Sequence, residues 1–292
     1  MTASSDLPYP PFELADRVIK LPSDDLNGYI HYELQGSDTR DQLVGMLPDG
    51  YSFEGRSLLD FGCGAGRTLR HFHDEAGSAR VVGCDIDQRS IDWLNTNLCP
   101  PLEAVRSEVD PPLAFEDASF DFIWAISVFT HLSDNSVPWL LELRRLLKPD
   151  GLLMASYMGE HNSEDTAGEP WDEDRVGMNV LRHSQDWDLG GPMVLMSDWW
   201  VEEHWGRAFD ILDRKPCGGQ TWTLMRKKEG EITPEELISP GEDPREFKAL
   251  HHNIKQLQRE IDELKAWNES RKPGASLKRG IRRRLPGGTR KN

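Results

Sequence analysis

Residues 58–67, LLDFGCGAGR, decide the fold of this chain. An apolar run ends at Asp60, and three glycines follow at Gly62, Gly64 and Gly66. Glycine permits a tight turn and lets the backbone approach a ligand that a Cβ atom would keep away. The stretch therefore predicts a strand, a ligand-binding loop and a helix that begins directly after the loop.

Strands and helices alternate after this loop. Short apolar runs predict strands, and apolar residues at helical spacing predict helices. The expected strands cover residues 57–61, 80–84, 103–107, 120–126, 152–157, 209–213 and 221–226, and the expected helices cover 68–75, 87–97, 138–147 and 198–207. This order predicts an α/β fold with a doubly wound, mostly parallel seven-stranded sheet, which binds ligands beyond the carboxyl ends of its strands.

The sequence divides into five predicted parts, of which the first three cover residues 1–246. Residues 1–56 read as short helices packed before the first strand, and 57–228 as the catalytic domain with an acidic, Trp-rich insertion at about 160–195. Residues 229–246 read as a polar linker. A chain that ends at Lys228 is therefore expected to stay folded.

A heptad pattern covers residues 247–268. Its apolar positions are Phe247, Leu250, Ile254, Leu257, Ile261 and Leu264. Phe or Ile at a with Leu at d favours a parallel coiled-coil homodimer, in which Glu260 and Lys265 can pair between chains. The alternative is one amphipathic helix docked on its own domain. Residues 269–292 read as a basic, disordered tail that would contact an anionic membrane or polymer, or nothing.

Charge and composition exclude several classes of protein. The net charge is −16, and residues 271–292 carry nine Lys or Arg and no acid, so the remainder carries −25. An acidic body argues against a nucleic-acid partner, which needs an extended basic surface. The four cysteines show no metal-type spacing, so no metal is expected. No secretory signal or membrane span is visible, which favours a cytoplasmic protein.

The glycine loop leaves two kinds of cofactor to weigh. The motif G-x-G-x-x-G is characteristic of a nicotinamide dinucleotide site, but here the third glycine comes one residue early, at Gly66. The negative charge of Asp60 would repel a diphosphate, whereas it suits a cationic amino group or a sulfonium. Asp85 ends the second strand, where an acid can accept hydrogen bonds from ribose hydroxyls or cap the next helix.

The motif D-x-G-x-G-x-G, followed by Asp85, FDFIWAISVFTHL and LKPDG, resembles the class I S-adenosylmethionine-dependent methyltransferases. The resemblance covers roughly residues 55–228 and implies S-adenosylmethionine as cofactor. It implies that the glycine loop surrounds the amino acid part of the cofactor, Asp85 holds the ribose, and further residues border the adenine or line the pocket. The implied cofactor residues are Asp60, Gly62, Cys63, Gly64, Gly66, Asp85, Ile86, Ser107, Val109, Ile126 and Ser127.

A hydroxyl acceptor would also benefit from a general base. His131, after the fourth strand, is the first candidate and His204 the alternative, while His161 and His183 lie in the insertion. Six tryptophans lie between 171 and 222, where they either pack a core or form a platform for a flat or sugar-like acceptor.

Residues 196–211, MSDWWVEEHWGRAFDI, loosely resemble methyltransferases found alongside bacterial glycan-building enzymes. We therefore expect O-methylation of a small molecule or a glycan-linked sugar. The alternatives are a catalytically silent scaffold subunit and an NAD-dependent oxidoreductase.

Overall fold

The computed structural model describes residues 7–183 and 185–271. Its centre is a seven-stranded sheet with the order β3-β2-β1-β4-β5-β9-β8. β9 runs antiparallel to both of its neighbours and the other strands are parallel, as expected. The strands are β1 (Ser57–Phe61), β2 (Arg80–Asp85), β3 (Glu103–Arg106), β4 (Phe120–Ala125), β5 (Leu147–Tyr157), β8 (Phe209–Cys217) and β9 (Gln220–Lys227).

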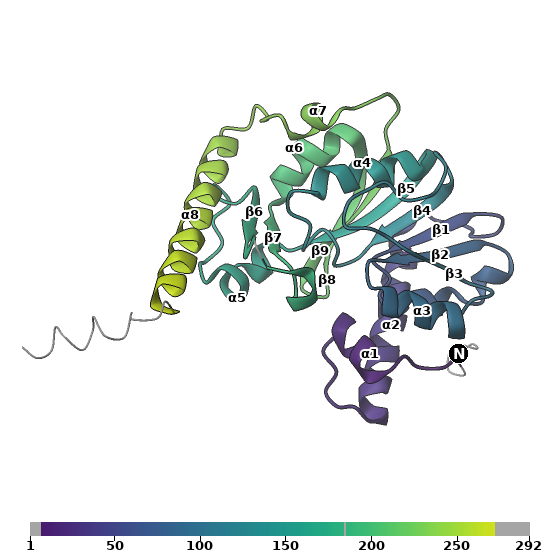
Figure 1. The fold of residues 1–292 in the computed structure, drawn as a ribbon. Coiled ribbons are helices and arrows are strands. Elements are labelled where there is room, and N and C mark those ends of the chain that lie inside the picture. Colours follow the sequence, from purple (N-terminus) through teal and green to yellow (C-terminus); the bar gives the residue numbers. More distant parts are fainter. Residues whose placement is uncertain (1–6, 184, 272–292) are drawn as a thin grey trace, which may run out of the picture.

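Helices cover both faces of this sheet (Figure 1). Because successive side chains of a strand point to opposite faces, Leu58 and Leu59 of β1 enter two different apolar clusters. Leu58 packs with α2 (Leu26–Met46) and α3 (Gln88–Asn97), and Leu59 packs with α4 (Ser136–Leu146) and α6 (Asp198–Ala208). The fold is therefore the doubly wound arrangement that the sequence predicts.

The N-terminal segment contains one long helix rather than several short ones. After α1 (Phe12–Val18), the 21-residue α2 begins at Asp25, whose side chain accepts hydrogen bonds from the Asn27 and Gly28 N–H groups. At Gly36, α2 lies so close to the glycine loop that a Cβ atom would come within 2.1 Å of the Arg67 carbonyl oxygen. The helix therefore backs the loop.

The helix predicted at 68–75 is wrong. The segment forms two 3₁₀ turns, η2 (Leu69–Phe72) and η3 (Glu75–Gly77). Leu69, Arg70 and Phe72 are all buried, and side chains one and two positions apart cannot share one face of an α-helix. The tighter turns bury all three side chains.

The insertion folds into a small layer of its own beside the main sheet. It contains η4 (Glu160–Asn162), α5 (Ser163–Ala167), β6 (Met178–Leu181), η5 (Trp187–Leu189) and β7 (Met193–Met196). β6 and β7 pair antiparallel, and Val194, Leu195 and Met196 are buried. Both strands are rich in apolar residues and each buries three residues in succession, so pairing removes this apolar surface from water.

The segment predicted as a linker packs on the domain. Residues 229–246 include α7 (Pro234–Ile238), whose Leu237 is buried in the main apolar cluster. α8 (Arg245–Arg271) then docks on β6, so the prediction that a chain ending at Lys228 stays folded is not supported. Glu260 bonds to its own chain, and the basic tail lies almost wholly outside the described residues.

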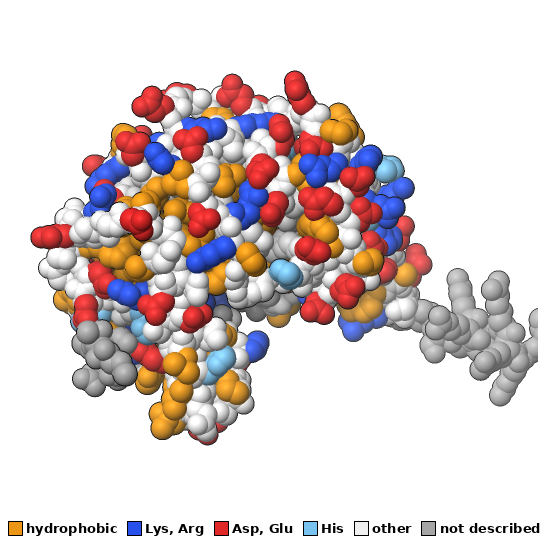
Figure 2. Space-filling view, turned by 180° about the vertical axis from the view of Figure 1, so that it is seen from behind, with side chains coloured by type: hydrophobic (Ala, Val, Ile, Leu, Met, Phe, Trp, Pro, Cys, Tyr) orange, Lys and Arg blue, Asp and Glu red, His pale blue; other side chains and the backbone are white. Residues whose placement is uncertain are grey.

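Within the described part of the chain, none of the helices is both long and apolar enough to span a bilayer. On the face shown in Figure 2, acidic and basic side chains are intermixed rather than gathered into a broad basic area.

Candidate functional site

A cleft of about 970 Å³ opens at the carboxyl ends of β1, β2, β3 and β4. The chain reverses its direction across the sheet between β1 and β4, which is where doubly wound folds bind ligands. The volume lies at the upper end of the usual range of ligand pockets, about 300–1,000 Å³. It is large enough for a cofactor and a second small molecule.

The glycine loop forms the floor of the cleft. Gly62 has φ +81°, and a Cβ atom there would come within 2.4 Å of Val128 Cγ2. Gly66 has φ +80° and would meet Leu94 Cδ2 at 2.7 Å. Both positions therefore need glycine for conformation and for space. Gly62 and Cys63 line the cleft, whereas the buried Gly64 and Gly66 shape the loop from behind.

Asp85 joins the end of β2 to the glycine loop. Its Oδ2 accepts a hydrogen bond from the Gly64 N–H at 2.7 Å, and its Oδ1 accepts one from the Asp87 N–H at 2.8 Å. Burial raises the pKa of Asp85, while these two N–H groups and Arg17 oppose the shift. The lone pairs that remain on the carboxylate can accept hydrogen bonds from a ligand in the cleft.

Asp60 and Arg67 lie together at the inner end of the cleft. Asp60 is buried, and its Oδ2 has no hydrogen-bond partner of normal length among the described residues. Burial raises the pKa of Asp60 to about 8 against the opposing charge of Arg67. Arg67 is half-buried, and its Nε also has no partner among the described residues. Orphaned buried polar atoms are costly, so a ligand that bonded to both would repay that cost.

The remaining predicted cofactor residues also line the cleft, from the loops that follow β2, β3 and β4. They are Ile86, Ser107, Val109, Ile126 and Ser127. The carbonyl of Val109 is held by hydrogen bonds of 2.9 Å from the Trp139 Nε1–H and the Asn135 Nδ2–H. Its side chain is 55% exposed and thus forms the open edge of the cleft.

Ser127 carries a strained backbone at the end of β4. Its φ of +60° lies in the left-handed region that L-residues rarely adopt. The Ser127 N–H donates to Ser156 Oγ at 2.7 Å, and Ser127 Oγ accepts from Gln220 Nε2 at 2.9 Å. Ser156 Oγ donates in turn to Gln220 Oε1 at 2.7 Å. Strain held by such a network is typical of functional sites. Ser156 and Gln220 were not predicted.

Arg17 closes the cleft from the N-terminal side. Its Nη1 lies 2.7 Å from Asp87 Oδ2, and its guanidinium lies 4.3 Å from the centre of the Trp187 ring. It thus joins α1, the loop after β2 and the insertion around one opening. No pattern in the sequence indicates this residue, because its partners are distant along the chain.

The four candidate histidines occupy different places. His131 and His183 line the cleft, whereas His161 is exposed outside it. His131 Nδ1 lies 2.9 Å from the Pro192 carbonyl oxygen. Since a carbonyl only accepts, Nδ1 carries the hydrogen, and Nε2 of the neutral ring is left as the acceptor. His183 Nε2 lies 3.0 Å from Asp134 Oδ1.

His204, the alternative base, lies away from the cleft. It is buried on α6, where Nδ1 contacts the Leu237 carbonyl at 2.8 Å and Nε2 contacts Glu246 Oε2 at 3.1 Å. Both ring nitrogens are occupied by groups of α7 and α8, so the structure does not support His204 as the base. Sequence alone could not tell which face of α6 points inward.

The tryptophans mostly pack the core. Trp199, Trp200, Trp205 and Trp222 are buried, and Trp171 packs on the insertion. Of the six between residues 171 and 222, Trp187 is the one that lines the cleft, at 40% exposure. The predicted aromatic platform is therefore reduced to Trp187.

The residues of the cleft fit S-adenosylmethionine. Its amino acid part carries one ammonium and one carboxylate, which match the orphaned oxygen of Asp60 and the orphaned Nε of Arg67. A dinucleotide fits poorly for two reasons. The 3₁₀ turn η2 replaces the α-helix whose N-terminus would bind the diphosphate. The carboxyl groups of Asp60 and Asp85 also line the part of the cleft that the diphosphate would occupy. Among the described residues, no cluster of three or more His, Cys, Asp or Glu can hold a metal ion.

Comparison with known proteins agrees with this fit. The methyltransferase-domain family model matches residues 59–155. A 2-methyl-6-phytyl-1,4-hydroquinone methyltransferase of Synechocystis is 30% identical over 121 residues, which are 41% of this chain and 37% of that protein. A 27-O-demethylrifamycin SV methyltransferase of Amycolatopsis mediterranei is 31% identical over 134 residues, covering 41% of this chain and 44% of that protein.

The match to solved structures concerns the fold alone. The PH0226 protein of Pyrococcus horikoshii OT3 superimposes with a TM-score of 0.50 at 18% identity, over 70% of this chain and 93% of that chain. The chain spans less than half the length of the two curated relatives. The family model spans the chain from β1 to β5.

Proposed function

Because the chain belongs to the class I S-adenosylmethionine-dependent methyltransferases, we propose that it methylates a hydroxyl group of a small-molecule or glycan-linked acceptor. When bound, S-adenosylmethionine supplies a methyl group activated by a sulfonium. The observation that carries the proposal is His131 at the edge of the same cleft, with Nδ1 held by the Pro192 carbonyl and Nε2 left as an acceptor.

The chain's own residues have three tasks in this proposal. Asp60, Arg67 and Asp85 bind the cofactor, and Arg17 with Trp187 narrows the opening above it. His131 Nε2 takes the proton of the acceptor hydroxyl as its oxygen forms the new bond to carbon. Holding the two reactants in line supplies much of the rate acceleration, and the base adds typically 10²–10⁴-fold.

The acceptor class rests on the acceptor side of the cleft and on the relatives. That side combines one exposed aromatic ring, Trp187, with small or polar groups at Gly190, Gly191 and Gln185. An aromatic surface beside polar groups suits a hydroxylated ring or a sugar. The names of the two curated relatives place a hydroquinone and a demethylrifamycin as their acceptors.

The test is a screen of candidate sugars and hydroxylated aromatics for the gain of one methyl group by mass spectrometry. Calorimetry with S-adenosylhomocysteine and with NAD accompanies it. We expect binding of S-adenosylhomocysteine, no binding of NAD, and transfer to at least one hydroxyl compound. Methylation of amines alone would overturn the acceptor class. Cofactor binding without turnover on any acceptor would favour the scaffold alternative, and NAD binding the oxidoreductase.

A further inference from the structure

Helix α8 uses a polar face to dock on its own domain. The Val180 N–H of β6 donates to Asn253 Oδ1 at 2.9 Å, and the Arg182 N–H donates to Glu260 Oε1 at 2.7 Å. Asn179 Nδ2 donates to the buried Gln256 at 3.0 Å. The side chains of α8 thus satisfy the free edge of β6, which would otherwise expose unpaired N–H groups.

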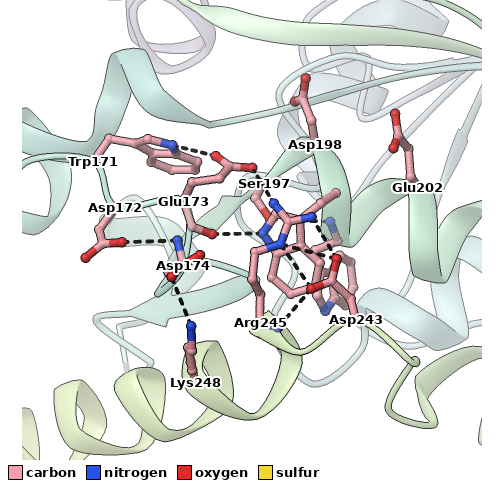
Figure 3. Close-up of polar contacts among 12 residues, drawn as sticks. Trp171, Asp172, Glu173, Asp174, Ser197, Asp198, Glu202, Asp243, Arg245 and Lys248 are labelled. Carbon is pink, nitrogen blue, oxygen red and sulfur yellow. Dashed lines mark hydrogen bonds and ion pairs between the residues drawn. The ribbon is translucent and has the colours of Figure 1, made fainter.

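Ion pairs fix the N-terminal end of the same helix. Arg245 contacts Glu173 at 3.5 Å, and its guanidinium lies 4.9 Å from the centre of the Trp199 ring. Lys248 Nζ contacts Asp174 Oδ2 at 3.0 Å. Figure 3 shows the ion pairs of Arg245 and Lys248, which join α8 to the acidic segment of the insertion. Two acidic residues of the insertion, Glu173 and Asp174, therefore anchor α8.

A second face of α8 is apolar and uncovered. We call it the apolar seam; it consists of Phe247, Leu250, Ile254, Leu257, Ile261 and Leu264. All except the half-buried Leu257 are between 44% and 67% exposed. Each docked residue at 246, 249, 253, 256 and 260 precedes a seam residue by one position, which is a rotation of about 100° on an α-helix. Docking therefore leaves the seam beside the body and in contact with solvent.

The shape of the seam fits a second helix of the same kind. Its residues recur at alternating steps of three and four, the narrow a/d pattern of a two-stranded coiled coil. A helix that packs on a globular body normally shows a broader stripe. Over residues 247–264 the pattern repeats without a polar interruption, so two copies can match along their whole length.

Other occupants fit less well. Residues 245–271 carry six Lys or Arg and five Asp or Glu, so α8 lacks the basic polar face of a membrane-surface helix. The polar face is also bound to the insertion. The chain's own C-terminal segment is another possible occupant of the seam. Residues 271–292 contain nine Lys or Arg, and Leu277, Ile281 and Leu285 recur at steps of four, which do not match the alternating steps of three and four in the seam.

We propose that the apolar seam of α8 joins two copies of this chain in a parallel, in-register pair. The salt bridge between Glu260 and Lys265 of two chains is not part of this pairing, because Glu260 already accepts a hydrogen bond from the Arg182 N–H, directly after β6. It also has a consequence for the cleft. The chain after β6 supplies His183, Gln185 and Trp187 to the acceptor side of the cleft, so a dimer that steadies α8 also steadies these residues.

The first test compares two variants of the full chain by light scattering and sedimentation. Ile254→Glu with Ile261→Glu places two charges in the seam, and Ala266→Glu with Ser270→Glu places the same charges on exposed positions outside it. We expect a dimer for the wild type and the control, and a monomer with an unchanged circular dichroism spectrum for the seam variant. A monomeric wild type, or a seam variant that stays dimeric, would overturn the proposal.

The second test concerns the direction of pairing. In a parallel pair residue 257 meets its own copy at a d position, whereas an antiparallel pair brings it opposite residue 254. We expect Leu257→Cys to form a disulfide-linked dimer on mild oxidation, at a yield above that of the wild type with its four native cysteines. Cross-linking only in a mixture with Ile254→Cys would overturn the parallel arrangement.

Discussion

The carboxylate of Asp85 accepts a hydrogen bond from the Gly64 backbone N–H at 2.7 Å. The acid that ends β2 therefore also fixes the loop that follows β1. The other carboxylate oxygen holds the Asp87 N–H at 2.8 Å, at the start of α3. One side chain thus fixes both the geometry of the glycine loop and the start of α3.

Replacing Asp85 should weaken cofactor binding by two routes. Asp85→Ala removes hydrogen bonds to the ligand, each worth about 1.5–3 kcal/mol for a charged group, and releases Gly64. We expect the affinity for S-adenosylhomocysteine, measured by calorimetry, to fall at least tenfold, with a lowered melting temperature. Asp92→Ala, on the exposed side of α3, is the matched control and should change neither. An unchanged affinity for Asp85→Ala would contradict the role.

Arg67 should recognise the carboxylate of the cofactor's amino acid part. Its unpaired Nε offers a charge-assisted hydrogen bond worth about 1.5–3 kcal/mol. We expect Arg67→Met to lower the affinity for S-adenosylhomocysteine tenfold or more. Methylthioadenosine, which lacks the amino acid part, should bind the variant and the wild type alike. An equal loss for both ligands would show that Arg67 only shapes the loop, through Thr39 and Gln35.

The buried Asp60 should make the unliganded protein less stable as the pH rises. Burial raises its pKa to about 8, from an ordinary value of 3.8, so between these values the folded state holds a proton that the unfolded chain has lost. Stability then falls by about 1.4 kcal/mol per pH unit across that window. We expect Asp60→Asn to remove this slope, with the stability gain greatest near pH 8. Denaturant titrations at pH 5 and pH 8 measure it.

Cofactor binding should reverse the protonation of Asp60. An ammonium beside the carboxylate favours its charged form, so binding releases a proton below pH 8 and the affinity for S-adenosylhomocysteine rises from pH 6 to pH 8. Calorimetry in buffers of different ionisation enthalpy counts the released proton. Asp60→Asn should release none at this site. The same proton count in variant and wild type would assign the release elsewhere.

The sequence was most informative where function depends on local spacing. Asp60, the three glycines and Asp85 lie within or just after two neighbouring strands, so their pattern places them together without any tertiary information. The sheet follows from the same alternation. The heptad of α8 was also readable, since it depends on spacing alone.

Long-range contacts were not readable. Arg17 contacts Asp87 and Trp187, and Gln220 contacts Ser127. These contacts form because segments far apart in the sequence come together at the same end of the sheet. The polar sequence of α7 predicts a linker, although Leu237 packs in the core. The sequence also does not show that His204 faces α7 and α8 rather than the cleft. A helix pattern does not say which element covers it.

His131 is the side chain we expect to remove the proton of the acceptor. The ring is oriented by the Pro192 carbonyl, so Nδ1 carries hydrogen and Nε2 of the neutral imidazole accepts. We expect His131→Ala to lower the methyl transfer rate roughly 10²-fold or more while S-adenosylhomocysteine affinity changes little. His131→Asn separates positioning from proton transfer, because its amide N–H can still donate to Pro192 but the side chain is no base. It should be as slow as the alanine variant.

His183→Ala, at the same cleft, and His204→Ala, outside it, are the controls. Full activity in His131→Asn would reduce His131 to a positioning residue. Normal turnover in His131→Ala with loss in His183→Ala would move the base across the cleft, and normal turnover in both would leave proximity alone to drive the reaction.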